Sequence, residues 1–190
     1  MTDEAVILAG GLGTRLKDVV SELPKPLAAV NGRPFLEYLL DYLYAWGIKH
    51  IVLSVSYKYE LIISHFAKSY KGMDISYAIE DKALGTGGAI SYALPFIGGD
   101  EAFVINGDSF FDAPLDKFYS FHNTNDAGAS LCLCYKDNAS RYGSVVIDAS
   151  QRVLSFSEKR NDPAGGYINA GIYLFNKGVY QAYSPGENYS

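Results

Sequence analysis

Two neighbouring segments near the start of the chain carry residue types that bind phosphate. The first, residues 8–16, reads Leu-Ala-Gly-Gly-Leu-Gly-Thr-Arg-Leu, and the second is Pro24-Lys25-Pro26. Glycines let a backbone approach a ligand closely and point successive N–H groups at anionic oxygens. Arg15 can grip phosphate through its planar guanidinium, whereas Lys25 supplies a compact charge on a backbone that its proline neighbours should hold extended. Together the two segments predict a site for a nucleoside triphosphate.

Neither of two better-known phosphate-binding motifs fits the first segment. A Walker loop requires Gly-x-x-x-x-Gly-Lys-Ser/Thr, and the segment has no such Lys-Ser/Thr pair. A dinucleotide fingerprint requires Gly-x-Gly-x-x-Gly, but after Gly11 and Gly13 the third glycine is replaced by Leu16. For the loop taken alone, a glycine-rich turn that serves only packing is the alternative. The two cations beside the loop favour phosphate.

An acid that follows an apolar run is a third candidate. The run Val104-Ile105-Asn106 leads through Gly107 to Asp108. A carboxylate at the end of a strand that faces a phosphate loop suits Mg²⁺, which shares its remaining positions with phosphates and water. Asp108 is therefore the predicted metal ligand, and Mg²⁺ the predicted cofactor. The alternative is that Asp108 only caps a helix or a turn.

A second glycine-rich segment could hold the base of a nucleotide. Residues 80–89 read Glu-Asp-Lys-Ala-Leu-Gly-Thr-Gly-Gly-Ala. A helix that starts there would favour an anion, and backbone contacts to a flat base fit the glycines equally well. The Glu80 carboxylate could accept hydrogen bonds from two adjacent donors, which guanine offers, whereas uracil and thymine offer one ring N–H. The pattern favours guanine, and the alternative for Glu80 is a surface charge at a strand end.

The overall composition narrows the class of protein. The 190 residues are 48% hydrophobic, enough to bury a full core in one domain or two fused lobes. A net charge of −5 argues against nucleic acid as the main partner. We see neither a targeting segment nor an apolar run of the ~20 residues that a membrane span requires. We therefore expect a cytoplasmic protein with small-molecule partners, no nucleic acid and no membrane, and we leave a homo-oligomer open.

The first two-thirds of the chain alternate short β-type runs with helical patterns. Strands are predicted at residues 5–9, 50–55, 75–79 and 102–106, and helices at 34–46, 59–70 and 86–94. Such alternation implies parallel strands with right-handed crossovers, and ligands gather at the carboxyl ends of such strands. The glycine loop, Glu80 and the Asn106–Asp108 segment each follow a predicted strand. We expect them to converge.

The remaining third should be mixed or antiparallel sheet that adds a second wall to the site. Strands are predicted at residues 129–135, 144–148, 153–157 and 167–175. Cys132 and Cys134 would share one strand face as reduced structural thiols. Glu158 could hold sugar hydroxyls and Lys159 could neutralise a sugar phosphate, although such a pair alone is usually solvated.

The ordered set of motifs resembles the sugar-1-phosphate nucleotidyltransferases over nearly the whole chain. The matched motifs are the glycine segment at 8–16, Pro-Lys-Pro at 24–26, Leu-Gly-Thr-Gly-Gly-Ala at 84–89, Asn-Gly-Asp at 106–108, Glu-Lys at 158–159 and Asn-Ala-Gly-Ile-Tyr at 169–173. Within this family the chain is most similar to the D-glycero-α-D-manno-heptose 1-phosphate guanylyltransferases, through residues 55–60 and 106–112.

The resemblance implies a single α/β nucleotidyltransferase domain of the nucleotide-diphospho-sugar transferase type. Its Rossmann-like, mixed but mainly parallel sheet is flanked by helices, with a nucleotide-binding half at residues 1–126 and a β-rich sugar-phosphate-binding half at 127–190. The implied reaction transfers NMP, here GMP from GTP, to a sugar 1-phosphate and releases pyrophosphate, with Mg²⁺ required. Such enzymes make nucleotide sugars, for example for surface polysaccharides.

The same resemblance implies roles for individual residues. Arg15 would hold the leaving pyrophosphate and Lys25 would lie near the α-phosphate, as the catalytic residues. Asp108 would bind Mg²⁺. The implied nucleotide-binding residues are Leu8, Ala9, Gly10, Gly11, Gly13, Thr14, Glu80, Gly85 and Thr86. The implied sugar-phosphate residues are Asn106, Gly143, Glu158, Lys159 and Asn169.

One departure from the family and two other functions stay open. Family members usually supply a second magnesium-binding Asp from a later segment, and no position before Ser190 matches it. Because residues 184–190 read like a loop, we expect the natural chain to continue. The first alternative function is a non-catalytic sensor that binds NTP or a sugar nucleotide to regulate a partner. The second is the same chemistry with another acceptor, such as mannose or glucose 1-phosphate or phosphocholine.

Overall fold

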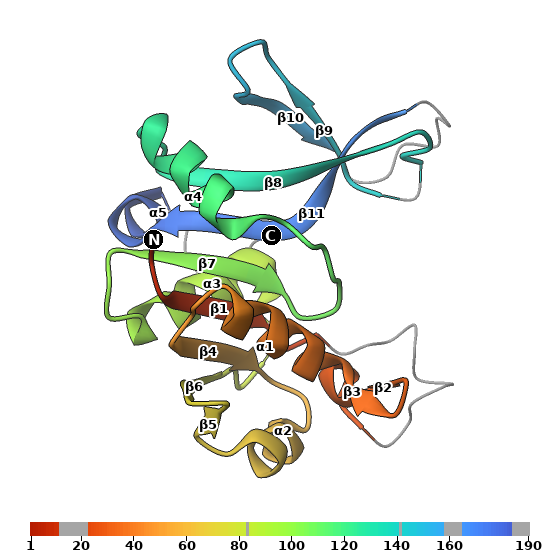
Figure 1. Cartoon of the computed structure of the whole chain (residues 1–190), viewed down its shortest axis with the longest axis vertical. Coiled ribbons are helices and arrows are strands. Elements are labelled where there is room, and N and C mark those ends of the chain that lie inside the picture. Colours follow the sequence, from red (N-terminus) through yellow and green to blue (C-terminus); the bar gives the residue numbers. More distant parts are fainter. Residues whose placement is uncertain (12–22, 83, 141, 158–164, 184–190) are drawn as a thin grey trace.

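The computed structural model describes residues 1–11, 23–82, 84–140, 142–157 and 165–183 (Figure 1). Its strands are β1 (Glu4–Leu8), β2 (Ala29–Val30), β3 (Arg33–Pro34), β4 (His50–Val55), β5 (Ser69–Tyr70), β6 (Met73–Ile79), β7 (Glu101–Asn106), β8 (Ala129–Lys136), β9 (Ser144–Ile147), β10 (Val153–Ser157) and β11 (Gly166–Asn176). Its helices are α1 (Phe35–Ala45), α2 (Tyr59–Phe66), α3 (Gly85–Ala93), α4 (Leu115–Thr124) and α5 (Lys177–Tyr183), with short 3₁₀ turns η2 (Lys25–Leu27) and η3 (Leu94–Phe96).

One mixed sheet runs through the described part of the chain. Its strand order is β10-β9-β11-β7-β1-β4-β6-β5, and β8 also pairs with β11. Strands β7, β1, β4 and β6 are parallel, so their carboxyl ends meet at one edge of the sheet. Strand β11 is antiparallel to β7 and to β8, and its beginning also pairs with β9. The structure therefore confirms the predicted α/β class with its mainly parallel sheet and β-rich second part.

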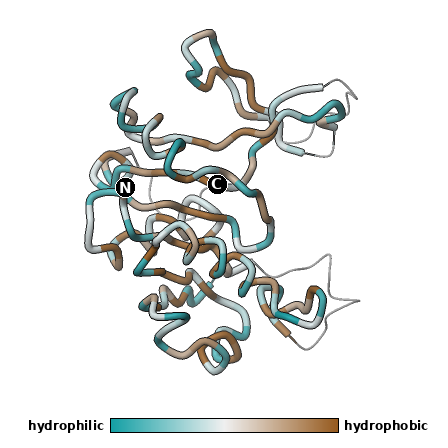
Figure 2. Tube along the Cα trace, in the orientation of Figure 1, coloured by the Kyte–Doolittle hydropathy of each residue, from teal (hydrophilic) through white to brown (hydrophobic). Residues whose placement is uncertain are grey.

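Helices cover both faces of this sheet because successive strand residues point to opposite sides. On β1, Ile7 packs into the core cluster that includes α1 and α2, whereas Val6 packs with residues of α3. Leu36, Leu40 and Leu43 recur at helical spacing and therefore share one face of α1, and all three are fully buried. Figure 2 shows the resulting apolar colouring along the central strands.

Most predicted elements agree with the structure to within a few residues, but one predicted helix is too long and several elements were not predicted. The helix predicted at 59–70 ends at Phe66, because Ala67 takes a left-handed conformation with φ of 51° and residues 69–70 form β5. Helices α4 and α5 were not predicted. In α4 the inner face is formed by Leu115 and His122 with the partly buried Phe118 and Tyr119, but Phe121 adds an aromatic residue to the exposed face, which obscures the pattern in the sequence.

Gly47, at φ of 80°, follows the last turn of α1, a position where glycine commonly ends a helix. Cys132 and Cys134 are free thiols on β8, and burial raises the pKa of Cys132. No helix in the described part of the chain is long and apolar enough to cross a membrane.

Candidate active site

A cleft of about 300 Å³ lies at the carboxyl ends of the parallel strands. It is lined by Leu8, Gly10, Gly11, Glu80, Gly85, Thr86, Ala89, Asn106 and Asp108. Leu8 is the last residue of β1, Asn106 is the last of β7, and Glu80 directly follows β6. The three segments that the sequence predicted to converge thus share one cavity.

Gly107 brings the end of β7 against the start of the glycine loop. Its N–H donates to the carbonyl of Leu8 at 2.9 Å. A Cβ at this position would lie 2.6 Å from that carbonyl oxygen, so a side chain there would force the backbone to move. Glycine at this position therefore lets Asp108 lie beside Leu8 and Gly10.

Lys25 and Asp108 form an ion pair at this end of the sheet. The Lys25 ammonium lies 2.5 Å from Oδ2 of Asp108, and the two side chains are 29% and 52% exposed. Pro24 is extended, but Lys25 itself opens the 3₁₀ turn η2, so the expectation of an extended Lys25 is wrong. The N–H of Leu27 donates to the carbonyl of Pro24 and closes this turn, and Leu27 is buried beneath it.

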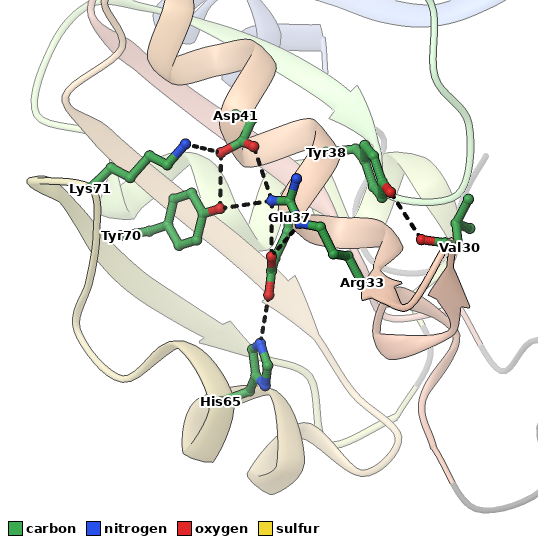
Figure 3. A network of polar contacts seen from close by, with 8 residues as sticks. All are labelled: Val30, Arg33, Glu37, Tyr38, Asp41, His65, Tyr70 and Lys71. Atoms are coloured by element: carbon green, nitrogen blue, oxygen red, sulfur yellow. Dashed lines mark hydrogen bonds and ion pairs between the residues drawn. The ribbon is translucent and has the colours of Figure 1, made fainter.

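A polar network fixes the β2–β3 hairpin, which follows Lys25 in the chain, onto α1 (Figure 3). Arg33 of β3 donates through Nε to Glu37 and through Nη2 to Asp41, both at 3.0 Å. Tyr38 of α1 donates its hydroxyl to the carbonyl of Val30, in β2, at 2.9 Å. The hairpin that follows Lys25 is therefore held to α1 at both of its strands.

The same network extends from α1 to β5, the edge strand of the main sheet, and to Lys71, which follows it. Asp41 accepts from the Tyr70 hydroxyl at 2.9 Å and from Lys71 at 2.7 Å. Partial burial alone would raise the pKa of Asp41, but the hydrogen bonds from Lys71, Arg33 and Tyr70 outweigh it and lower this pKa to about 2. His65 of α2 meets Glu37 at 3.0 Å, so it is a surface residue of this network, outside the cleft.

Glu80 is a buried acid with two protein donors. It is 6% exposed; the Ser54 hydroxyl donates to Oε1 at 2.7 Å, and the Leu84 N–H donates to Oε2 at 3.1 Å. A Cβ on Gly10 would come within 3.0 Å of Oε1, so glycine at position 10 lets the loop lie directly against this carboxylate. These contacts contradict the alternative that Glu80 is a solvated charge at a strand end. The sequence analysis missed Ser54, although a serine inside the apolar run of β4 was a signal.

Two of the candidate sugar-phosphate residues, Gly143 and Asn169, belong to the second part of the chain, where Gly143 precedes β9 and Asn169 lies in β11. The Asn169 amide donates to the Tyr173 hydroxyl at 2.6 Å and accepts from the Gly171 N–H at 2.8 Å. The Asn169 N–H also points at the carbonyl of Gly143, at 3.4 Å. Gly143 and Asn169 thus lie together, but they are not among the residues that line the cleft.

Gly171 joins this group to the cleft. It has φ of 76°, and a Cβ there would lie 2.8 Å from the Ser109 hydroxyl and 2.9 Å from the Asn106 amide. Strand β11 can therefore pass directly beside the end of β7, where Asn106 lines the cleft. The structure in this way connects the Asn169 segment to the cleft through Asn106.

Several predicted site residues lie elsewhere or outside the described residues. Ala9 is buried, and its N–H donates to the carbonyl of Ser54 at 2.8 Å, which leaves it out of the cleft lining. The other predicted residues, Gly13, Thr14, Arg15, Glu158 and Lys159, lie outside the described part of the chain.

The donor chemistry at Asp108 fits a Mg²⁺ ion. Within the described residues, no three or more His, Cys, Asp and Glu side chains gather into a metal cluster. Mg²⁺ does not need such a cluster, since one or two carboxylates, substrate phosphates and waters complete its octahedron. The half-exposed Asp108 carboxylate lines the cleft and could serve as one such ligand.

A glycine loop, a buried acid and a Lys–Asp pair at the carboxyl edge of a parallel sheet define an α/β nucleotide-binding protein. The family model described as nucleotidyl transferase matches residues 4–189, and the chain belongs to this family. The D-glycero-α-D-manno-heptose 1-phosphate guanylyltransferase of Campylobacter jejuni is 44% identical over 187 residues, which are 98% of this chain and 82% of the relative. The enzyme of the same name from Aneurinibacillus thermoaerophilus is 42% identical over 187 residues, which are 98% of this chain and 80% of that relative.

Solved structures agree with these relatives. HddC from Yersinia pseudotuberculosis has a TM-score of 0.88 and 38% identity, covering 98% of this chain and 82% of that one. The same protein has also been solved in complex with GMP-PN, with a TM-score of 0.87. The predicted family and the predicted enzyme class, a sugar-1-phosphate nucleotidyltransferase, are thereby confirmed.

Proposed function

We propose that this chain transfers GMP from GTP to D-glycero-α-D-manno-heptose 1-phosphate and releases pyrophosphate. The observation that carries the proposal is one cleft lined by the buried acid Glu80 and by Asp108, which forms an ion pair with Lys25. The first suits a base with two adjacent donors, and the second suits phosphate and a metal. The names of the relatives at 44% and 42% identity support GTP and the heptose.

At the base end, Glu80 reads guanine through its carboxylate. Each carboxylate oxygen has two acceptor positions, so the donors from Ser54 and Leu84 leave capacity for a ligand. The guanine N1–H and 2-amino groups would occupy that capacity. Gly10, Gly85 and Thr86 line the same cleft and provide the close backbone approach that a flat base requires.

At the phosphate end, positioning and charge do the chemical work. A sugar phosphate is already an anionic nucleophile, so its oxygen attacks the α-phosphorus directly, and the bond to the bridging oxygen of the leaving pyrophosphate breaks. The obstacle is repulsion between two polyanions. Lys25 neutralises the α-phosphate and Arg15 holds the leaving pyrophosphate, which lowers the barrier by preorganised electrostatics. Asp108 would hold Mg²⁺, and the ion would supply further neutralisation of phosphate charge.

The second part of the sheet takes the sugar phosphate. In this proposal residues 1–126 form the nucleotide-binding half and residues 127–190 the sugar-phosphate half. The residues proposed to bind the sugar phosphate are Asn106, Gly143, Glu158, Lys159 and Asn169. The reaction belongs to nucleotide-sugar biosynthesis and takes place in the cytoplasm, where GTP is available.

The test is pyrophosphate release with Mg²⁺, each NTP in turn and a panel of sugar 1-phosphates. We expect release with GTP and the manno-heptose 1-phosphate, and weaker release with mannose or glucose 1-phosphate. Mannose 1-phosphate belongs in the panel because the mannose-1-phosphate guanylyltransferase of Mycobacterium tuberculosis is 38% identical over 188 residues, although this chain covers only 52% of it.

The other outcomes separate the alternatives. Release with a different pair would keep the enzyme class and refute the heptose or the guanine. Binding of GTP, seen as a higher melting temperature, without release from any pair would indicate a sensor in place of an enzyme.

A further inference from the structure

We propose that Ser54 is a positioning residue that sets the base specificity of the cleft by orienting Glu80. This inference rests on the proposed function in one respect, namely that Glu80 reads the base. Ser54 is not among the residues that line the cleft, so it acts only through the acid. None of the motifs discussed above includes it.

The position of Ser54 makes its hydroxyl unusual. It lies in the central strand β4, opposite Leu8 of β1 and Ala78 of β6, and none of its surface is exposed. Val52, two residues earlier on the same face of the strand, and Ala78 are apolar and fully buried. A hydroxyl in such surroundings costs free energy unless it has a partner. Its partner is Oε1 of Glu80, at 2.7 Å.

Three contacts together fix the plane of the Glu80 carboxylate. Ser54 holds Oε1 from within the sheet, and the N–H of Leu84 holds Oε2 from the start of α3 at 3.1 Å. Gly10 packs so closely on Oε1 that a Cβ there would lie 3.0 Å away. The carboxylate cannot turn about its own bond without losing one donor or striking the loop. Its remaining acceptor positions therefore have a fixed direction.

A fixed carboxylate distinguishes bases by the number of donors they present. Guanine offers the N1–H and the 2-amino group side by side, whereas hypoxanthine keeps the N1–H and lacks the amino group. Adenine places an acceptor, N1, against the acid. If Ser54 no longer holds Oε1, the carboxylate can turn and the second donor of guanine loses its partner. The preference for GTP over ITP then measures the orientation of Glu80.

The experiment compares the binding of GTP and ITP to the wild type and to Ser54→Ala by titration calorimetry, with pyrophosphate release measured alongside. We expect the wild type to bind GTP more tightly than ITP. In Ser54→Ala this ratio should fall about tenfold, the value of one hydrogen bond to a charged group. The loss should appear in KM for GTP more than in kcat. Ser54→Thr, which keeps the hydroxyl, should restore the ratio.

Two further variants separate positioning from general structural damage. Ser130→Ala removes another buried hydroxyl, one that contacts His122 at 2.8 Å away from the cleft, and it should leave the GTP-to-ITP ratio unchanged. Glu80→Gln alone should abolish the preference for GTP over ITP. Adding Ser54→Ala to it should change the GTP-to-ITP ratio no further, because Ser54 acts through Glu80.

The outcomes are distinct. An unchanged ratio in Ser54→Ala, or a wild type that binds GTP and ITP equally, overturns the inference even if the enzyme releases pyrophosphate from GTP. If Ser54→Ala does not fold, Ser54→Cys takes its place: its weak thiol donor should lower the ratio, and an unchanged ratio again overturns the inference. A wild type that shows the expected binding ratios but no pyrophosphate release refutes the proposed enzyme and supports the role of Ser54.

Discussion

Lys25 and Asp108 show how a side-chain pair can be arranged for a ligand more than for stability. Their ion pair is 2.5 Å long, yet the side chains are 29% and 52% exposed. Exposed ion pairs contribute only about 0–1 kcal/mol to stability, because water screens them. The pair's place beside a glycine loop therefore matters more than its contribution to folding.

Replacing Lys25 by alanine should reduce activity far more than stability. We expect kcat/KM to fall by a factor that corresponds to about 3–4 kcal/mol of lost transition-state stabilisation, the contribution of one preorganised donor. The melting temperature without ligand should move by no more than about 2–4 °C, which corresponds to roughly 1 kcal/mol in a protein of this size. Pyrophosphate release and differential scanning calorimetry check the two expectations.

The matched control for Lys25 is Lys49→Ala. Lys49 also forms an ion pair, with Asp3 at 3.0 Å, but it precedes β4, at the end of the strand opposite to the cleft. This variant should keep full activity. A Lys25→Ala protein that melts well below the wild type and loses activity only in proportion would contradict a role for Lys25 in catalysis.

Gly107→Ala tests the close approach between β7 and the glycine loop. Because the new Cβ would lie 2.6 Å from the carbonyl oxygen of Leu8, the backbone must shift, and we expect a loss of about 1–3 kcal/mol in the free energy of unfolding. Gly166→Ala is the control, since among the described residues its Cβ would meet only Ala139, at 3.9 Å. Urea denaturation of both variants gives the comparison, and equal stability of the two would show that the junction relaxes freely.

At the scale of elements, the sequence was most informative where burial and periodicity agree. Apolar runs predicted the central strands, and their order along the chain predicted parallel pairing. The end of α2 escaped prediction because Ala67, a good helix former, adopts a left-handed conformation that only the following turn explains. Helix α4 escaped because its exposed face carries Phe121.

Sequence motifs were enough to predict which residues form the candidate site, but not the side-chain contacts that hold them in place. The sequence placed Glu80 and Asp108 after strands, and the structure brings both into one cleft. Sequence patterns alone could not find the donor that Ser54 supplies to Glu80, because it joins residues 26 positions apart on neighbouring strands. Nor could they show that Arg33 holds the hairpin after Lys25 to α1, since that depends on which way its long side chain points.

The Arg33 network predicts a specific dependence of stability on pH. Asp41 has a folded-state pKa of about 2 against an ordinary value of 3.8. A lowered acid pKa adds stability above the ordinary value, and this contribution is lost as pH falls from 3.8 towards 2. Arg33→Met removes one of the hydrogen bonds that lower this pKa, so the acid limb of the stability curve should become shallower. At pH 7 we expect only a small loss of stability, since Arg33 is partly exposed and water screens its ion pairs.

Urea denaturation at a series of pH values checks this expectation. Lys117→Met is the control, because this exposed lysine of α4 stands apart from the network. If the stability curves of Arg33→Met and the wild type run parallel below pH 4, Arg33 does not stabilise the ionised form of Asp41. The pH dependence would then have another source.

On the scale of the whole molecule, the sheet does not stop at the boundary between the two proposed halves. Strand β11 pairs with β7 on one side and with β8 on the other, so a strand of the second half completes the sheet of the first (Figure 1). Ile172 and Leu174 of β11 are buried in the same core cluster as Ile7 and Leu40. Asn106, which lines the cleft, ends β7, and β7 is held between β1 and β11, so the cleft keeps its geometry only while both halves are folded.

Both halves should therefore unfold in one transition. Trp46, the one tryptophan of the chain, reports on the first half, and Cys132, labelled by a brief pulse of thiol reagent in a Cys134→Ser protein, reports on the second. The two urea midpoints should coincide. Leu174→Ala leaves a cavity where none of the side chain was exposed, and it should lower both midpoints together by an amount that corresponds to about 2–5 kcal/mol. If the variant shifted the Cys132 transition and left that of Trp46 in place, the halves would be separate folding units, and the cleft would depend on how they dock.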